Sequence, residues 1–190
     1  LHQGRLLEVG PPHELYARPR TEFVARFLGA ANLIVGINEP QGVRVGPCLF
    51  PLKTKGGEHE DAGRVQVLFR PEDVAVKDDP DALEWPLLGK AIVEENSFFG
   101  SIERLRLRLP KLKGVRMIDP PPVFGEDGIV VEASRSQHQA RRYPLAPGDA
   151  AWVGLRRIHA LPHPGLRLLA VAGADVGDDS AIAHAVRLAE

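Results

Sequence analysis

Residues 104–109 carry the clearest alternation of polar and apolar positions in this chain. Leu105, Leu107 and Leu109 occupy every second position, and an arginine precedes each of them. A period of two places the leucines on one face of a β-strand and the arginines on the other. This segment is therefore predicted to be a strand with one buried and one solvated face.

The chain just before this strand predicts a hairpin. The apolar residues 91–93 are expected to form its partner strand, and residues 97–101 look like a tight connection. Gly100 supplies the permissive backbone that such a connection needs. Ile102 and Glu103 do not continue the alternation, so a bulge or turn is expected there.

Further short apolar segments, separated by glycine, proline and polar residues, predict a chain rich in β-strands. The expected strands are residues 5–9, 33–37, 43–45, 48–52, 67–69, 74–76, 129–132 and 151–156. Pro71 lies between two of them and cannot donate a ladder hydrogen bond, so it is expected at a strand end or bulge. The proline-containing residues 111–127 are expected to be irregular.

Two short helices are expected near the N-terminus. The first, residues 12–17, begins with a proline, because a first-turn residue loses nothing by lacking an N–H group. Pro19 then stops it. Thr21 is the expected N-cap of a second helix over residues 22–28, which Gly29 ends.

The last part of the chain changes character after residue 162. Residues 166–172 follow an apolar strand pattern, and Ser180 can cap a helix after an intervening loop. Strand, loop and helix in this order open an α/β unit. This segment resembles the first β–α unit of universal stress proteins, although Ala172 stands where that family has an acid.

Composition narrows the classes of function. The formal net charge is −1, so no overall field favours nucleic acid or an anionic membrane. Cys48 is the only cysteine, which excludes an internal disulfide framework and fits a reducing compartment. No apolar segment approaches the roughly 18–20 residues that span a bilayer. No signal-peptide pattern opens the chain, and its start at Leu1 suggests an excised fragment.

Candidate metal ligands are few. Glu58, His59 and Asp61 are close together in a Gly-flanked polar segment, a pattern far more typical of exposed turn residues than of a metal site. No nucleophile–base pair and no paired carboxylates stand out. No catalytic residue, metal or cofactor is therefore expected in this chain.

The sequence GRLLEVGPPHELYARPRTEFVARFLGAANLIVG, residues 4–36, is similar to the end of the nucleotide-binding domain of ABC importer ATPases. Three later motifs resemble a TOBE domain, a small β-barrel-like module of the same subunits. They are R-P-E-D-V at 70–74, the hairpin ending in F-G-S at 99–101, and L-A-P-G-D at 145–149.

The catalytic motifs of those ATPases are not found in this sequence. The only Gly-Lys pair, Gly89-Lys90, is followed by alanine and lacks the earlier glycine that a P-loop needs. No L-S-G-G-Q signature and no apolar run ending in Asp-Glu occurs either. This chain alone is not expected to hydrolyse ATP, and the resemblance implies ATP and magnesium only for a full-length parent.

The resemblance implies three parts: residues 1–31 as the tail of the nucleotide-binding domain, 32–161 as a TOBE-like regulatory domain, and 162–190 as a linker and truncated α/β fragment. The expected fold is mainly β, a TOBE/OB-like β-barrel or sandwich with two short N-terminal helices and a small C-terminal β–α fragment. The implied function is that of a non-catalytic regulatory and dimerisation region. It would belong to an importer subunit that drives uptake of an oxyanion, iron, a polyamine or a sugar.

The resemblance also implies partners and a location. A second copy would pair through the β domain. The full complex would add transmembrane permease subunits and a solute-binding protein. The subunit would lie in the cytoplasm, peripheral on the inner face of the cell membrane.

Two alternatives stay open. Some TOBE domains bind oxyanions, and arginine forks and hydroxyl donors suit an anion. The candidate ligand or interface residues are Ser97, Ser101, Arg104, Arg106, Ser134 and Arg135. The basic segment 134–142 is more typical of a solvated hairpin rim than of an anion site. A nucleic-acid-binding OB-type barrel, with Phe98 and Phe99 stacking on bases, is opposed by the near-zero net charge.

Overall fold

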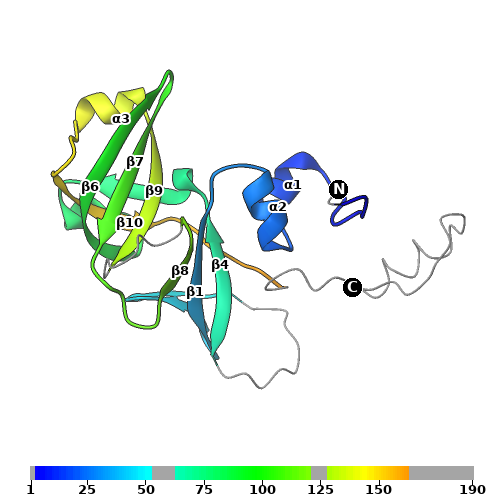
Figure 1. The fold of residues 1–190 in the computed structure, drawn as a ribbon. Helices are drawn as coiled ribbons and strands as arrows, with labels where there is room; N and C mark the ends of the chain where they lie inside the picture. Colours follow the sequence, from blue (N-terminus) through cyan, green and yellow to red (C-terminus); the bar gives the residue numbers. More distant parts are fainter. Residues whose placement is uncertain (1–2, 53–62, 121–127, 163–190) are drawn as a thin grey trace, which may run out of the picture.

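The computed structural model of the protein describes residues 3–52, 63–120 and 128–162. These residues form two antiparallel sheets accompanied by short helices (Figure 1). The α-helices are α1 (Pro12–Ala17), α2 (Glu22–Phe27) and α3 (Gln137–Arg142), and the 3₁₀-helices are η1 (Pro71–Asp73) and η2 (Pro80–Ala82).

The first sheet has six strands. They are β1 (Asn32–Glu39), β2 (Gly42–Val45), β3 (Cys48–Phe50), β4 (Arg64–Phe69), β8 (Arg116–Asp119) and β11 (His159–Ala160). The strand order is β11-β4-β1-β2-β3, and β8 also pairs with β1. Strand β1 is therefore the centre of this sheet.

The second sheet has five strands. They are β5 (Val74–Lys77), β6 (Leu87–Phe99), β7 (Ile102–Leu109), β9 (Ile129–Ser136) and β10 (Ala150–Leu155), in the order β5-β10-β6-β7-β9. The edge strands β5 and β9 also contact each other, so this sheet curls toward a barrel.

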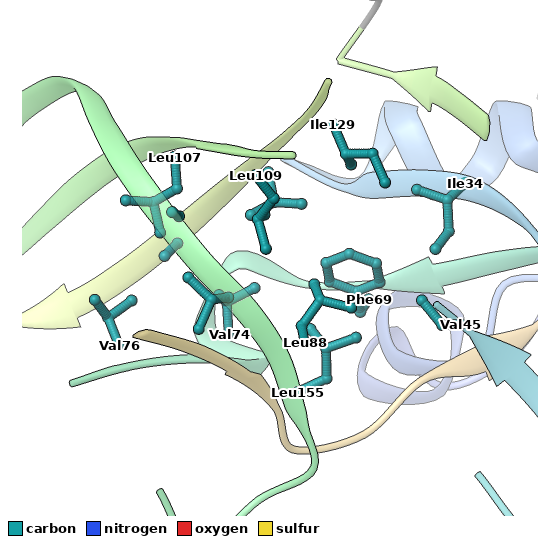
Figure 2. Close-up of a cluster of buried hydrophobic side chains, with 14 of the residues drawn as sticks. Ile34, Val45, Phe69, Val74, Val76, Leu88, Leu107, Leu109, Ile129 and Leu155 are labelled. Atoms are coloured by element: carbon teal, nitrogen blue, oxygen red, sulfur yellow. The ribbon is translucent and has the colours of Figure 1, made fainter. Parts of the chain in front are cut away.

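The main hydrophobic core lies between the two sheets. The three leucines of β7 are buried in it, as the alternation predicts. Figure 2 shows Ile34 and Phe69 of the six-stranded sheet lying near Leu109 and Ile129 of the five-stranded sheet. Apolar side chains from both sheets thus form one continuous core, and their burial is the main force holding the sheets together.

Helices α1 and α2 lie beside the six-stranded sheet (Figure 1). Ala25 of α2 packs with Leu33, Leu68 and Leu161 in a second, smaller buried cluster. Strand side chains alternate between faces, so Leu33 faces this cluster while its neighbour Ile34 faces the main core. The six-stranded sheet is therefore covered on both faces where α2 packs.

The predicted fold class is confirmed: the described chain is mainly β, with two short helices before the sheets. The Thr21 side-chain oxygen caps α2 by accepting a hydrogen bond from the backbone N–H of Val24, at 3.3 Å. The predicted C-terminal β–α fragment lies outside the described residues. The boundaries 1–31, 32–161 and 162–190 stay predictions.

The predicted strand at residues 5–9 does not form. Arg5 makes an isolated bridge, and the residues after it have no regular structure. The Glu8 carboxylate instead accepts hydrogen bonds from the backbone N–H groups of Arg20 and Thr21, at 2.8 and 3.1 Å. The segment is thereby held beside the start of α2.

The bulge or turn predicted at Ile102 and Glu103 is wrong. Both residues belong to β7, which pairs continuously with β9. Glu103 occupies a core-facing position, and Arg135 neutralises its buried carboxylate. The irregularity lies in the partner strand instead, where the register of β6 shifts between Val93 and Glu95.

Two segments are more regular than their composition indicated. Residues 116–119 form β8, because β1 offers them ladder hydrogen bonds. Strand β9 continues to Ser136, and α3 follows it directly. The Ser136 side chain accepts from the Gln139 N–H at 3.3 Å, and the Gln139 side chain accepts from the Ser136 N–H at 2.9 Å. This capping box starts α3.

Candidate functional site

The register of the five-stranded sheet brings three of the predicted site residues into one row. Ser97 of β6 lies opposite Arg104 of β7, and Arg104 lies opposite Ser134 of β9. Directly opposed residues of antiparallel strands share a face. Because the odd-numbered residues of β7 face the core, this row lies on the outer face of the sheet.

Arg104, at the centre of the row, has an incomplete set of partners. Its guanidinium lies over the Phe99 ring, 5.2 Å from the ring centroid, within the range of a cation–π contact. Its Nε atom is buried and has no hydrogen-bond acceptor among the described residues. A buried donor without an acceptor is costly, so this side chain is the best placed of the row to receive an anion.

Arg106 lies next to this row on the same face but is already neutralised. It lies opposite Glu95 of β6 and Glu132 of β9. Its Nε atom donates to a carboxylate oxygen of Glu94 at 3.0 Å, and Arg108 reaches the other oxygen of that carboxylate at 2.6 Å. The bulge residue Glu94 thus forms ion pairs with Arg106 and Arg108, two of the three outer-face arginines of β7.

Ser101 lies at the tip of the β6–β7 hairpin. Gly100 and Ser101 form the two-residue turn between Phe99 and Ile102, and Gly100 has a positive φ of 65°. Glycine at the first central position suits such a hairpin turn. The Ser101 hydroxyl is beyond the row, while its carbonyl accepts from the Gln137 N–H at 3.2 Å.

Arg135 is separated from the other candidates, because it lies on the core-facing side of β9 and is only 4% exposed. Its guanidinium binds the Glu103 carboxylate, through Nε at 2.7 Å and also through a terminal nitrogen, and donates to the Tyr143 carbonyl at 2.8 Å. Asn96 donates to the same carboxylate at 2.8 Å. The buried charges of Arg135 and Glu103 are thus paired with each other and hydrogen-bonded. The structure does not bring Arg135 to the outer row.

Exposed apolar side chains gather along β6 and the turn before it. These side chains, called the β6 strip below, are Trp85, Leu87, Ile92, Phe98 and Phe99. Ile92 and Phe99 lie on the outer face of the sheet, whereas Phe98 lies opposite Glu103 on the other face. Phe98 and Phe99 are 74% and 55% exposed, at the tip of the hairpin. In Figure 1 this hairpin projects past the other strands of its sheet.

A second polar centre, which the sequence did not predict, joins the N-terminal helices to the sheets. Arg70 follows β4 and is only 2% exposed. Its guanidinium donates to the carbonyl oxygens of Tyr16, at 2.8 Å, and of Ala25, at 2.9 Å. It also donates to the carbonyls of Gly29 and Ala30, at 3.2 and 3.0 Å. Arg70 thereby binds carbonyls at the C-terminal ends of both α1 and α2.

The side chains around Arg70 extend this joint. The Arg70 guanidinium lies over the Tyr16 ring, 4.0 Å from its centroid, and the Tyr16 hydroxyl donates to Glu72 at 2.9 Å. Arg157 binds the Asp73 carboxylate at 2.6 Å. Burial raises the pKa of the Asp73 carboxyl, and Arg157 opposes that rise. The R-P-E-D motif could have signalled this joint, but only the fold reveals its partners.

The described residues offer few groups for metal binding or nucleophilic chemistry. In the described part of the chain, His, Cys, Asp and Glu side chains form no group of three or more that could hold a metal. Burial raises the pKa of the Cys48 thiol to about 11, so this thiol is a poor nucleophile near neutral pH. Glu58, His59 and Asp61 lie outside the described residues.

In the described parts of the chain, no helix has the length and apolar character to cross a membrane. No family model matches the chain.

The chain is similar in sequence to import ATP-binding proteins. The chain is 33% identical over 168 residues to the sulfate/thiosulfate import ATP-binding protein CysA 2 of Chromobacterium violaceum, covering 87% of this chain and 40% of that protein. It is 39% identical over 77 residues to the molybdate/tungstate import ATP-binding protein WtpC of Thermococcus kodakarensis, and the match covers 40% of this chain and 22% of that protein. It is 33% identical over 115 residues to the spermidine/putrescine import ATP-binding protein PotA of Oleidesulfovibrio alaskensis, and the match covers 57% of this chain and 30% of that protein.

The chain thus spans less than half the length of these relatives. The predicted resemblance to ABC importer ATP-binding subunits is confirmed. Among solved structures, the chain is similar to the molybdate-bound cytoplasmic molybdate-binding protein ModG, with a TM-score of 0.36 and 13% identity, covering 51% of this chain and 62% of that one. A likeness this remote does not bear on function.

Proposed function

We propose that this chain, whose homologues are ATP-binding subunits of ABC importers, is the regulatory and dimerisation region of such a subunit. In this proposal the chain is not catalytic, and ATP and magnesium bind elsewhere in the full-length protein. The parent complex includes permease subunits and a solute-binding protein, and it lies on the inner face of the cell membrane. The transported solute is a small one of the oxyanion, iron, polyamine or sugar classes.

The observation that carries this proposal is the β6 strip. Apolar side chains left in water cost free energy in proportion to their area, at about 25 cal/mol per Å². A second copy of the same strip would cover them in a two-fold symmetric dimer. The outer-face arginines and carboxylates beside Ile92 and Phe99 would then form the polar rim of the interface.

The Arg70 joint supports the regulatory part of the proposal. The helices α1 and α2 lie within the segment that resembles the end of the ATPase domain, and Arg70 binds both of them to the β region. Pairing of two β regions would therefore orient the two ATPase domains relative to each other. No covalent chemistry by the β region is required for this role.

The test is the oligomeric state of the full 190-residue chain, measured by light scattering after size exclusion. The wild-type chain is expected to be a dimer, and the double variant Ile92→Ser/Phe99→Ser is expected to be a monomer with unchanged thermal unfolding of the monomeric fold. Leu49→Ser, at an exposed apolar position on the other sheet, is the matched control and should remain dimeric. A monomeric wild-type chain, or a double variant that still dimerises, would rule out this interface.

A second candidate function is the sensing of a small oxyanion by the outer row. The buried Nε of Arg104, which lacks an acceptor among the described residues, and the flanking hydroxyl of Ser134 favour it. The Ser97 hydroxyl on the other side already donates to the Glu95 carboxylate at 2.7 Å. A ligand at a hundred times its Kd stabilises the folded state by about 2.7 kcal/mol. Thermal melting with sulfate, molybdate and phosphate should show such a shift in the wild-type chain and not in Arg104→Gln. Potassium chloride of equal ionic strength is the control.

A further inference from the structure

Four successive rows of side chains cross the outer face of the five-stranded sheet, where β6 and β7 run side by side (Figure 1). Neighbouring rows lie about 7 Å apart, because alternate residues share a face and each residue of an antiparallel strand rises by about 3.4 Å. Counted from the hairpin tip, the second row is the outer row described above. The first is the tip row, Phe99–Ile102–Ser136; the third is the acidic row, Glu95–Arg106–Glu132; and the fourth is the Ile92 row, Ile92–Arg108.

The outer row and the acidic row carry opposite charges that are not paired within the described residues. Arg104 forms no ion pair there, and its guanidinium contacts the Phe99 ring. In the acidic row, Arg106 is bound by Glu94. Glu132 forms no ion pair in the described chain, and the Glu95 carboxylate accepts the Ser97 hydroxyl at 2.7 Å. One positive and two negative charges therefore remain on neighbouring rows.

Exposed apolar side chains lie on either side of these two charged rows. Phe99 of the tip row is 55% exposed, and Ile92 of the fourth row is 45% exposed. Both residues belong to β6. Along this face the order of rows is therefore apolar, positive, negative, apolar.

This order restricts how two copies can pair face to face. A two-fold axis that lies between the facing sheets and runs along the rows exchanges rows that are equally far from it. An axis midway between the outer and acidic rows brings each outer row against the partner's acidic row, and each Phe99 against the partner's Ile92. An axis through the outer row would place Arg104 against its own copy. An axis through the acidic row would do the same to Glu95 and Glu132, and like charges oppose both arrangements.

We propose that two copies of this chain pair about the midway axis, with Arg104 of each copy between the Glu95 and Glu132 carboxylates of the other. Phe99 of each copy covers Ile92 of the other. This inference rests on the dimerisation proposed above and adds its register and the charges that fix it. The acceptor for the Arg104 guanidinium is then a carboxylate of the second copy, so a small oxyanion on the outer row would compete with dimer formation.

The first experiment exchanges the charges of the two rows in the full chain. Arg104→Glu and Glu95→Lys/Glu132→Lys each place like charges opposite each other in both halves of a homodimer. Each is expected to raise the dimer Kd by about tenfold or more. An equimolar mixture of the two variants restores opposite charges in both halves of the heterodimer and should dimerise as the wild type does. Light scattering after size exclusion measures this, and Arg142→Glu on α3 is the control that should remain dimeric.

The second experiment detects the register by cross-linking. About the midway axis, Phe99 lies against Ile92 of the other copy, while the two copies of Phe99 are three row spacings apart, about 20 Å. A short bismaleimide should therefore cross-link a mixture of Phe99→Cys and Ile92→Cys, and it should not cross-link either variant alone. The native Cys48 is buried, and the wild-type chain measures its background reaction.

The outcomes separate the register from dimerisation itself. A monomeric wild-type chain, or an Ile92→Ser/Phe99→Ser variant that still dimerises, would overturn both. If these two behave as proposed, dimerisation stands and three results would overturn the register alone. They are an Arg104→Glu variant that dimerises as tightly as the wild type, a mixture of the charge variants that stays monomeric, and a Phe99→Cys variant that cross-links to itself.

Discussion

Single buried residues in this protein act through partners that are distant in sequence. The buried polar or charged residues of the described chain are Asn32, Arg70, Asp73, Glu103 and Arg135, and each has a partner. Arg70 binds a carbonyl 54 residues away, and Arg135 binds a carboxylate 32 residues away. Leaving any one of these groups unpaired would cost about 1–3 kcal/mol or more.

His159 gives a prediction at this scale. Its Nε2 atom lies 2.9 Å from the Pro19 carbonyl, a contact in which the neutral ring donates. Burial lowers the pKa of His159 below its ordinary 6.5, the Pro19 carbonyl opposes this, and nearby Arg18 adds to it. As the pH falls, His159 therefore takes up a proton in the unfolded chain before it does so in the folded chain. The stability of the fold decreases from about pH 6.5 downward and levels off once the pH is below the pKa of His159 in the folded chain.

His159→Gln keeps a donor for the Pro19 carbonyl but cannot titrate. In urea unfolding between about pH 5 and pH 7, a range around the ordinary histidine pKa of about 6.5, the free energy of unfolding of this variant is expected to depend less on pH than that of the wild-type chain. His138→Gln, at an exposed position of α3, should leave the wild-type dependence unchanged. Equal pH profiles for His159→Gln and the wild type would contradict the assignment.

At the scale of elements, the short helices depend on the sheet beside them. Helices α1 and α2 have six residues each, far too few to be stable alone in water. Burial of Ala25 against Leu33 and Leu68 contributes one part of their stability. Arg70 contributes another, because its guanidinium satisfies carbonyls at both helix ends.

Arg70→Met is therefore expected to destabilise the chain by about 3 kcal/mol and to release α1 and α2 before the sheets unfold. Arg70→Lys keeps the charge but not the planar fork, so its loss should be intermediate. Hydrogen exchange of the helix amides and urea unfolding measure the two effects. Arg156→Met, at an exposed position, is the control. Unchanged amide protection of α1 and α2 in Arg70→Met would show that the joint does not hold the helices.

At the scale of the whole molecule, a side chain of the central strand β1 links the two sheets by a pair of hydrogen bonds. Asn32, at the start of β1, is fully buried. Its amide nitrogen donates to the Glu132 carbonyl at 2.9 Å, and its oxygen accepts from the Glu132 N–H at 2.7 Å. Glu132 lies on β9, the edge strand of the other sheet. Asn32 therefore satisfies an edge that would otherwise lose its hydrogen bonds on burial.

Asn32→Leu leaves both backbone groups of Glu132 buried without partners. The expected loss of unfolding free energy is about 2–6 kcal/mol, at 1–3 kcal/mol for each of the two groups. Urea unfolding followed by circular dichroism and by tryptophan fluorescence measures this loss and shows whether the sheets still unfold together. Gln41→Leu, in the exposed turn between β1 and β2, should change stability little. A loss in Asn32→Leu as small as in this control would exclude the bridging role.

The sequence by itself determined the local elements. The alternation at residues 104–109 predicted β7 and its buried leucines correctly, and Thr21 predicted the start of α2. These features depend on the period of the backbone and on a side chain three residues from its partner. Both relations involve residues that are close together in the sequence, so they can be predicted from residue order alone. The resemblance to importer subunits was also carried by residue order alone.

Only the tertiary structure decided which distant residues meet. Ser134 and Arg135 are neighbours in sequence, yet the strand pleat sends one to the outer row and the other to Glu103 in the core. The ladder that makes residues 116–119 a strand comes from β1, about eighty residues earlier in the chain. Register between separated strands also places Arg104 and Ser134 in one row. Because register is a property of paired strands, no single segment of the sequence contains it.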